Sequence, residues 1–116
     1  SYIHAEGLSA GELKHGFIAL VEPTLPTIAI VTNDEVKTKM LANIAEVKAR
    51  GGPVIAIANL PLPEADATIV VPNVGSDYLQ PLVNNIGLQL LAYYTAKTKQ
   101  LDIDQPRNLA KSVTVE

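Results

Sequence analysis

Two apolar runs, Pro26-Thr27-Ile28-Ala29-Ile30-Val31-Thr32 and Pro53-Val54-Ile55-Ala56-Ile57-Ala58-Asn59, decide the fold. Their length, their β-branched residues and the prolines that open them predict two buried strands. Between them, apolar residues recur every three or four positions, which predicts an amphipathic helix. A strand–helix–strand order implies a right-handed crossover, so the two runs are expected to be parallel neighbours in one sheet.

The helix between the two runs has start and stop signals of its own. Thr32 and Glu35 have the spacing of a capping box, and Gly51-Gly52 is typical of a helix C-terminus. The expected inward-facing residues of this helix are Val36, Met40, Ile44 and Val47.

Downstream, the pattern predicts another strand and the longest helix of the chain. The third strand is expected at Ala67–Pro72, after a loop rich in proline and acidic residues. Ser76-Asp77 is expected to cap a helix that runs to about Lys99. The expected core face of that helix is Leu79, Leu82, Val83, Ile86, Leu90 and Tyr94.

Upstream, the sequence predicts a short strand at Tyr2–Ala5 and a helix from Ala10 to about Val21. Ser9 and Glu12 have capping-box spacing, and Glu22-Pro23 is expected to end the helix. The whole pattern predicts an α/β fold, with a parallel sheet flanked by helices.

The composition narrows the class of protein. With 116 residues, of which 47% are hydrophobic, the chain is the size of one domain. A net charge of −3 argues against binding to nucleic acid, which needs a basic patch. The absence of cysteine is consistent with a cytoplasmic protein, and no apolar run is long enough to span a membrane. Nucleotide-binding glycine motifs are absent and there are two histidines, so no cofactor or metal is expected.

The first candidate chemistry is the pair Glu12 and His15, three positions apart on the expected helix. A carboxylate beside an imidazole can fix its tautomer or its charge, which suits proton transfer. An exposed helical turn with an ordinary ion pair explains the same spacing. The glycines on both sides, Gly11 and Gly16, favour close approach of a ligand or another chain.

The second candidate is the C-terminal tail, residues 103–116, which follows the domain predicted at residues 1–102. Lys111 could form a Schiff base with a carbonyl substrate, or it could be a solvated surface lysine. Arg107 could clamp a carboxylate or phosphate, or it could form a surface ion pair. Two further phosphate candidates, Thr32-Asn33 and Gly75-Ser76, follow strands at expected helix N-termini, where each is also explained as a simple cap.

Two stretches carry a resemblance to a known family. Ser9-Ala10-Gly11-Glu12-Leu13-Lys14-His15-Gly16 and the ending Asp104-Gln105-Pro106-Arg107-Asn108-Leu109-Ala110-Lys111-Ser112-Val113-Thr114-Val115-Glu116 resemble the C-terminal end of the glucosamine-6-phosphate synthases. These are glutamine:fructose-6-phosphate amidotransferases. Related sugar-isomerase (SIS) proteins share Pro106-Arg107-Asn108-Leu109 but differ after it. One departure is Phe17, where the family usually has proline.

The resemblance implies an incomplete SIS subdomain of flavodoxin-like order, the second of a pair. Its first strand would lie upstream of Ser1 and would sit between Tyr2–Ala5 and the strand at Thr27–Thr32. The resemblance therefore implies a gap in the sheet, and the chain is expected not to fold as a lone monomer.

The resemblance also implies a chemistry and a set of residues. The family couples aldose–ketose isomerisation to amination, converting fructose 6-phosphate and glutamine-derived ammonia to glucosamine 6-phosphate. Lys111 would contact the carbonyl end of the open-chain sugar, and Ala110 would contribute a backbone contact. His15 would promote ring opening in the active site of a neighbouring subunit, so a homodimer, or association with the missing subdomains, is implied. The glutamate base, the phosphate cradle and the glutaminase would lie in missing parts, so the parent would be the enzyme and this piece would be inactive alone.

Two other functions fit some of the same features. A non-catalytic sugar-phosphate-binding SIS module would need several serines and threonines after the strands, and only isolated candidates are present. A pure dimerisation module would place the long helix and the segment around His15 at an interface, and would make Lys111 dispensable.

Overall fold

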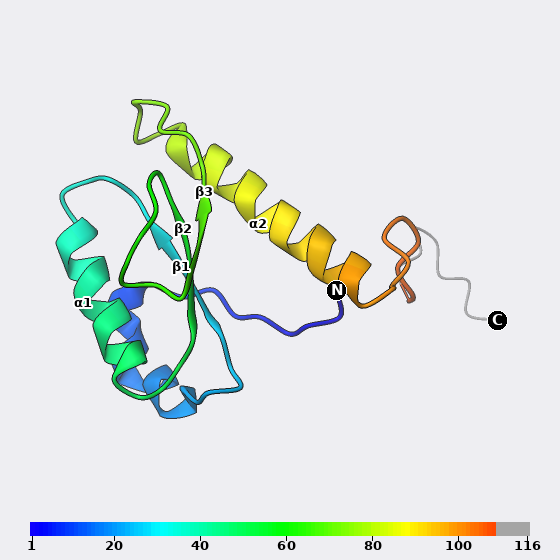
Figure 1. Cartoon of the computed structure of the whole chain (residues 1–116), viewed down its shortest axis with the longest axis horizontal. Coiled ribbons are helices and arrows are strands. Elements are labelled where there is room, and N and C mark those ends of the chain that lie inside the picture. Colours follow the sequence, from blue (N-terminus) through cyan, green and yellow to red (C-terminus); the bar gives the residue numbers. More distant parts are fainter. Residues whose placement is uncertain (109–116) are drawn as a thin grey trace.

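The computed structural model of the chain describes residues 1–108. Within this range two short 3-10 helices precede three strands and two α-helices (Figure 1). The elements are η1 Ala10–His15, η2 Phe17–Leu20, β1 Thr27–Val31, α1 Lys37–Lys48, β2 Val54–Ala58, β3 Ala67–Val70 and α2 Gln80–Thr98. No helix in this range is long and apolar enough to cross a membrane.

The three strands form one parallel sheet in the order β1-β2-β3. In this register Ile30 pairs with Ile57, and Ile57 pairs with Ile69. The predicted parallel α/β sheet flanked by helices is therefore confirmed. The two helices lie on opposite sides of the sheet, with α1 on one face and α2 on the other (Figure 1).

The face under α1 holds the main core. Side chains alternate along a strand, so β1 and β2 present alanine and valine to α1 and isoleucine to the other face. These small residues let α1 approach closely, and its Ile44 and Val47 are each only 2% exposed. The core cluster on this side comprises Ala29, Val31, Ile44, Val47, Val54, Ala56, Ala58 and Leu62.

On the other face, α2 lies against β2 and against Val71, directly after β3. Ile57 is fully buried there, and Gly87 of α2 lies so close that a Cβ on it would be 3.3 Å from Ile57. Ile28 and Ile30 of β1, on the same face, are 36% and 37% exposed. The isoleucine face is therefore closed at β2 and open at β1.

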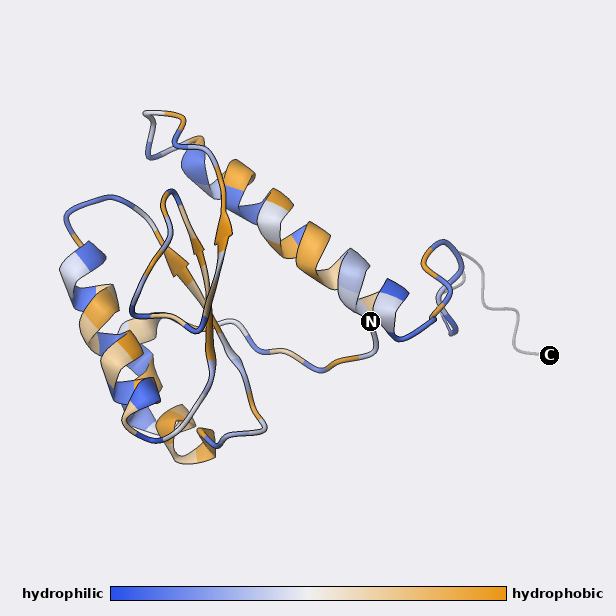
Figure 2. Cartoon of the chain, viewed as in Figure 1, coloured by the Kyte–Doolittle hydropathy of each residue, from blue (hydrophilic) through white to orange (hydrophobic). Residues whose placement is uncertain are grey.

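The predicted core face of α2 is wrong for most of its residues. Leu82 is 65% exposed and Ile86 is 53% exposed, whereas Gln80, Asn84 and Gly87 are buried. The sheet contacts the helix along the side of Gly87, because only that side permits close approach. Hydrophobic residues recur along α2 up to its last turns, which are pale or hydrophilic in Figure 2. The exposed members of the predicted face are Leu79, Leu82, Ile86, Leu90 and Tyr94, while Val83 is half-buried.

The first twenty residues differ from the prediction as well. Tyr2–Ala5 is not a strand, and the expected helix is split at Gly16 into η1 and η2. Gly16 has a φ of 147°, which breaks the helical path. The Ser9 side chain forms no cap; its carbonyl oxygen accepts from the Glu12 N–H at 2.9 Å. The capping box predicted here is therefore wrong.

The start of α1 is also set by a residue other than the predicted one. The Asp34 carboxylate accepts from the Val36 N–H at 3.0 Å and from the Thr32 hydroxyl, and the helix begins at Lys37. An Asx-type turn at Asp34 thus replaces the Thr32–Glu35 capping box. The glycine stop signal is confirmed, because Gly51 has a φ of 78° and the Gly52 N–H bonds to the Val47 carbonyl at 3.2 Å.

Candidate functional site

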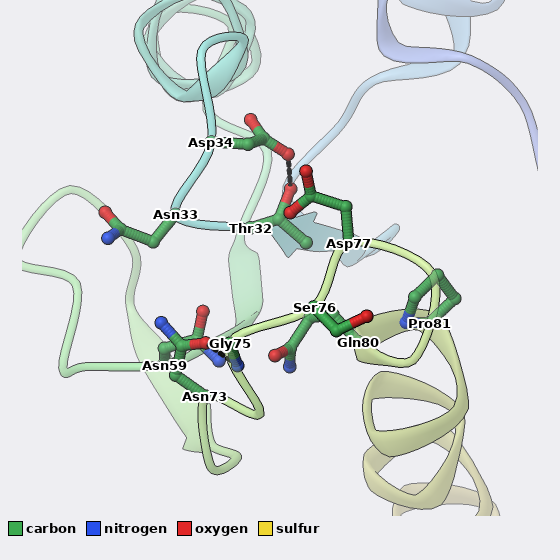
Figure 3. Close-up of a pocket in the computed structure, with 10 residues that line it drawn as sticks. All are labelled: Thr32, Asn33, Asp34, Asn59, Asn73, Gly75, Ser76, Asp77, Gln80 and Pro81. Atoms are coloured by element: carbon green, nitrogen blue, oxygen red, sulfur yellow. Dashed lines mark hydrogen bonds between the residues drawn. The ribbon is translucent and has the colours of Figure 1, made fainter.

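A polar pocket opens where the three parallel strands end. We call it the carboxyl-edge pocket; it has a volume of about 410 Å³ and is shown in Figure 3. Ligands of open α/β sheets bind at this edge, outside the carboxyl ends of the strands. Its lining residues are Thr32, Asn33, Asp34, Asn59, Asn73, Gly75, Ser76, Asp77, Gln80 and Pro81.

Gln80 organises the loop between β3 and α2. Its Oε1 accepts from the Val74 N–H at 3.1 Å, and its Nε2 donates to the Pro72 carbonyl at 3.1 Å and to Asn84 Oδ1 at 2.9 Å. The side chain is 5% exposed, and these bonds replace the water that burial removes. Gln80 thus fixes one wall of the pocket to the first turns of α2.

Asn59 ties the same loop to the end of β2. Its Nδ2 lies 3.2 Å from the carbonyl oxygens of both Val71 and Pro72. Asn73 then bonds to the Gly75 N–H at 2.8 Å, which shapes the turn before α2. Sequence patterns did not point to Asn59, Asn73 or Gln80 as parts of a site. The signal available for the first two was an asparagine at the end of a predicted strand or directly after it.

The two phosphate candidates, Thr32-Asn33 and Gly75-Ser76, do line the same pocket. Asp34 and Asp77 line it with them, so two carboxylates face the space that an anion would occupy (Figure 3). The Thr32 hydroxyl is already bonded to Asp34, and the nearby Lys37 reaches Asn33 at 3.3 Å. Like charges repel an anion, so this pocket is poorly suited to hold a phosphate.

His15 and Glu12 lie on η1, away from the carboxyl-edge pocket. Both side chains are exposed, and no hydrogen bond or ion pair between them is present in the described part of the chain. Lys14, between them, forms an ion pair with Glu46 of α1 at 2.5 Å, and Leu13 packs against the core. The segment is thus fastened to α1, while the His15 imidazole is open to solvent at the Gly16 break.

Of the tail, residues 103–116, the structure describes only residues 103–108. Ala110 and Lys111 lie outside the described residues, so their predicted roles are not tested. Arg107 lies inside the described range, and its guanidinium carbon is 4.3 Å from the centre of the Tyr2 ring. His4, the other histidine, bonds to Glu6 at 3.3 Å, and residues 1–108 hold no cluster of three or more side chains that could bind a metal.

Comparison with known proteins assigns the family. The SIS domain family matches residues 1–99. The chain belongs to the SIS family. This agrees with the parallel sheet and with the resemblance seen in the sequence.

Two similar relatives and a solved structure point to one group of SIS proteins. The glutamine–fructose-6-phosphate aminotransferase (isomerizing) of Methanosarcina mazei is 54% identical over the full chain, and that of Brucella abortus is 51% identical. The C-terminal domain of glucosamine-fructose-6-phosphate aminotransferase from Francisella tularensis superimposes with a TM-score of 0.76 at 40% identity. That match covers 90% of this chain and 30% of the other. The chain spans about a fifth of the length of the curated relatives it matches.

Proposed function

We propose that this SIS chain is the C-terminal part of the isomerase portion of a glutamine–fructose-6-phosphate aminotransferase. The supporting observation is identity of 54% to such an enzyme over the whole chain, together with the 40% identical structural neighbour. In this proposal the parent protein converts fructose 6-phosphate and glutamine-derived ammonia to glucosamine 6-phosphate. The chain alone is inactive, and the parent works in the cytoplasm as a homodimer.

Lys111 is the residue of this chain that we propose touches the substrate most directly. Its amine would meet the carbonyl end of the open-chain sugar, and the Ala110 backbone would line the same place. An amine is suited to this position because it can donate to a carbonyl oxygen or add to the carbonyl carbon.

His15 would act at a neighbouring subunit. Its imidazole is exposed on a segment fastened to α1 by the Lys14–Glu46 ion pair, so it is presented outward from the body that carries it. An imidazole can both accept and donate a proton, which is the transfer that ring opening of a sugar requires.

A sugar-phosphate-binding module without catalysis is less well supported. It would need a phosphate cradle within this chain, and the carboxyl-edge pocket contains Asp34 and Asp77. The substrate phosphate is therefore expected to be held by another part of the parent protein.

The lysine is tested in a chimera of the Methanosarcina mazei relative, with this chain in place of the matching C-terminal fifth. Lys111→Ala is expected to lower glucosamine 6-phosphate formation about 100-fold or more, the range that loss of a proton-transfer or covalent group gives. Glutamine hydrolysis should be largely retained. The matched control is Lys97→Ala at the exposed end of α2, which should change neither activity. Unchanged product formation in Lys111→Ala would refute the role and favour a pure dimerisation module.

The action of His15 across subunits is tested by mixing two inactive chimeras. A dimer of one Lys111→Ala subunit and one His15→Asn subunit regains one intact site if the histidine serves its partner. Random mixing should then restore about a quarter of the wild-type activity, because half the dimers are mixed and each has one intact site. No recovery on mixing would place His15 in the site of its own subunit.

A further inference from the structure

The segment that carries His15 is attached to the body of the chain on both sides of the histidine. Before it, Leu13 packs against the core cluster, and Lys14 Nζ lies 2.5 Å from Glu46 Oε1 of α1. After it, Val21 packs against the same cluster. The histidine therefore lies between two attachments that belong to the α1 side of the sheet.

The short helix η1 does not hold this position by itself. It has six residues and buries none of them. Runs of 3-10 helix longer than about three or four residues are uncommon, because their hydrogen-bond geometry is poor. Gly16, with a φ of 147°, ends η1 directly after His15, so η2 does not extend it. Since η1 contacts α1 (Figure 1), the contacts with α1 decide where the His15 backbone lies.

Glu46 gives η1 a fixed point of attachment. It lies on α1 between Ile44 and Val47, and both of these are buried in the core, so its backbone is held firmly. Its partner Lys14 is the direct neighbour of His15 in the sequence. Both side chains of the pair are partly exposed, which makes this an ion pair of modest strength.

We propose that the attachment of η1 to α1 positions the His15 imidazole for ring opening, and this inference rests on the function proposed above. The positioning residues are Leu13, Lys14 and Glu46, and none of them touches the substrate. A proton moves between groups at hydrogen-bond distance, so a small shift of η1 on α1 lowers the rate of transfer.

The ring-opening step can be separated from the rest of the reaction by the choice of sugar. Ring opening breaks the bond between C2 and the ring oxygen, takes a proton from the C2 hydroxyl and gives one to the C5 oxygen. The analogue 5-deoxyfructose 6-phosphate lacks the C5 oxygen and stays open-chain. It bypasses the step assigned to His15, whereas a general loss of folding in a variant affects both sugars.

The test measures kcat/KM for both sugars in the full-length chimera. His15→Asn should lower the value for fructose 6-phosphate and leave that for the analogue unchanged. Lys14→Glu, which sets two carboxylates against each other, should show the same selectivity with about a fivefold loss, the most that a partly exposed ion pair supports. Equal losses with both sugars, or no loss with fructose 6-phosphate, would overturn the inference. If His15→Asn itself lacks the selectivity, the proposed function of His15 fails instead.

Exchange of the two charges tests the ion pair directly. Glu46→Lys should cause a loss similar to that of Lys14→Glu, and the double variant should recover most of the activity, because the exchanged side chains attract again. The matched control compares Lys14→Ala with Lys48→Ala, since Lys48 also lies on the α1 side but pairs with Asp66. Lys48→Ala should leave both values of kcat/KM unchanged. A double variant without recovery, or equal losses in the two alanine variants, would overturn the inference.

Combination with His15→Asn distinguishes positioning from an independent role. If the ion pair acts through the histidine, Lys14→Glu should cause no further loss with fructose 6-phosphate in the His15→Asn background. A further loss of about fivefold there would overturn the inference and leave the role of His15 intact.

Hydrogen exchange of the chimera reads the attachment without activity. Leu13→Ala and Lys14→Glu should speed amide exchange in the peptide that covers η1, while Lys48→Ala should leave it unchanged. Equal exchange in the wild type and in Lys14→Glu would show that the ion pair does not hold η1 and would overturn the inference.

Discussion

The face of the sheet under α1 and the face beside α2 are built from the same strands but are closed to different degrees. Under α1, small residues of β1 and β2 meet Ile44 and Val47, and this side is nearly sealed. Beside α2, Ile57 is fully buried, yet its register partner Ile30 on the neighbouring strand is 37% exposed. α1 alone buries the small side chains on its face of the sheet. On the isoleucine face, α2 alone leaves Ile28 and Ile30 of β1 partly exposed.

α2 also exposes large apolar side chains. Leu82 and Ile86 point away from the strands and are more than half exposed. Large exposed apolar surfaces on soluble proteins mark sites that another chain or segment covers. This agrees with the expectation, implied by the family resemblance, that a strand missing from this chain lies beside β1.

The largest expected effect is on the free energy of unfolding, and it differs between the face under α1 and the isoleucine face. Ile44→Ala should lower the free energy of unfolding by about 2–5 kcal/mol, because it removes a buried side chain and leaves a cavity. Ile30→Ala, the same change on the open face, should cost about 1 kcal/mol or less, in proportion to its smaller buried area. Urea denaturation followed by circular dichroism, at one fixed chain concentration, measures both. Equal losses of unfolding free energy in Ile44→Ala and Ile30→Ala would contradict the difference in packing between the two faces.

Two glycines test how tightly each helix side is packed. A Cβ on Gly52 would lie 2.5 Å from Val21 and 2.9 Å from Val47, on the α1 side. Gly52→Ala should therefore destabilise the chain by about 1–3 kcal/mol, the usual cost of overpacking. Gly87→Ala meets Ile57 and Val71 at 3.3 Å and also gains about 1 kcal/mol of helix propensity, so its net effect should be near zero. The same urea titration ranks the two variants, and a larger loss at Gly87 would reverse the comparison.

The open surface should be visible in the association of the isolated chain. We expect the chain to self-associate or precipitate on size exclusion, and Leu82→Glu with Ile86→Glu to reduce this. Each exposed substitution should change the free energy of unfolding by about 0.5 kcal/mol or less. In the full-length chimera the same pair should impair assembly, because it places charge where another segment packs. A compact, stable monomer of the unmodified chain would contradict the prediction.

The smallest effect concerns an ion pair at the edge of the α1 side. Asp66 bonds to Lys48 and accepts from the Val54 N–H at 2.7 Å, and the Lys48 hydrogen bond is the main cause that lowers the pKa of the Asp66 carboxyl. A carboxyl with a lowered pKa in the folded state contributes stability above its unfolded pKa, and that contribution is lost as the pH falls through the folded pKa. Asp66→Asn should therefore flatten the acid limb of the stability profile. An acid limb with the same slope in Asp66→Asn as in the wild type would contradict this.

Part of the candidate site could be predicted from the sequence. The SIS resemblance rested on the segment around His15 and on the tail, and the family assignment confirmed it. The roles of Lys111 and His15 stay predictions. Asn59 and Gln80 were missed as parts of a site, because nothing local distinguishes them from loop and helix residues until the ends of β2 and β3 are brought together.

The sequence by itself determined β1, β2, β3, the position of α1 and its glycine stop, because periodicity, β-branching and backbone freedom act over a few residues. Only the tertiary structure decided which side of α2 is buried. Leucine spacing marks an apolar stripe, but Gly87 sets where the helix can touch Ile57 and Val71. It also decided that Tyr2 meets Arg107, because a contact across 105 positions depends on the path of the whole chain and leaves no local pattern to read.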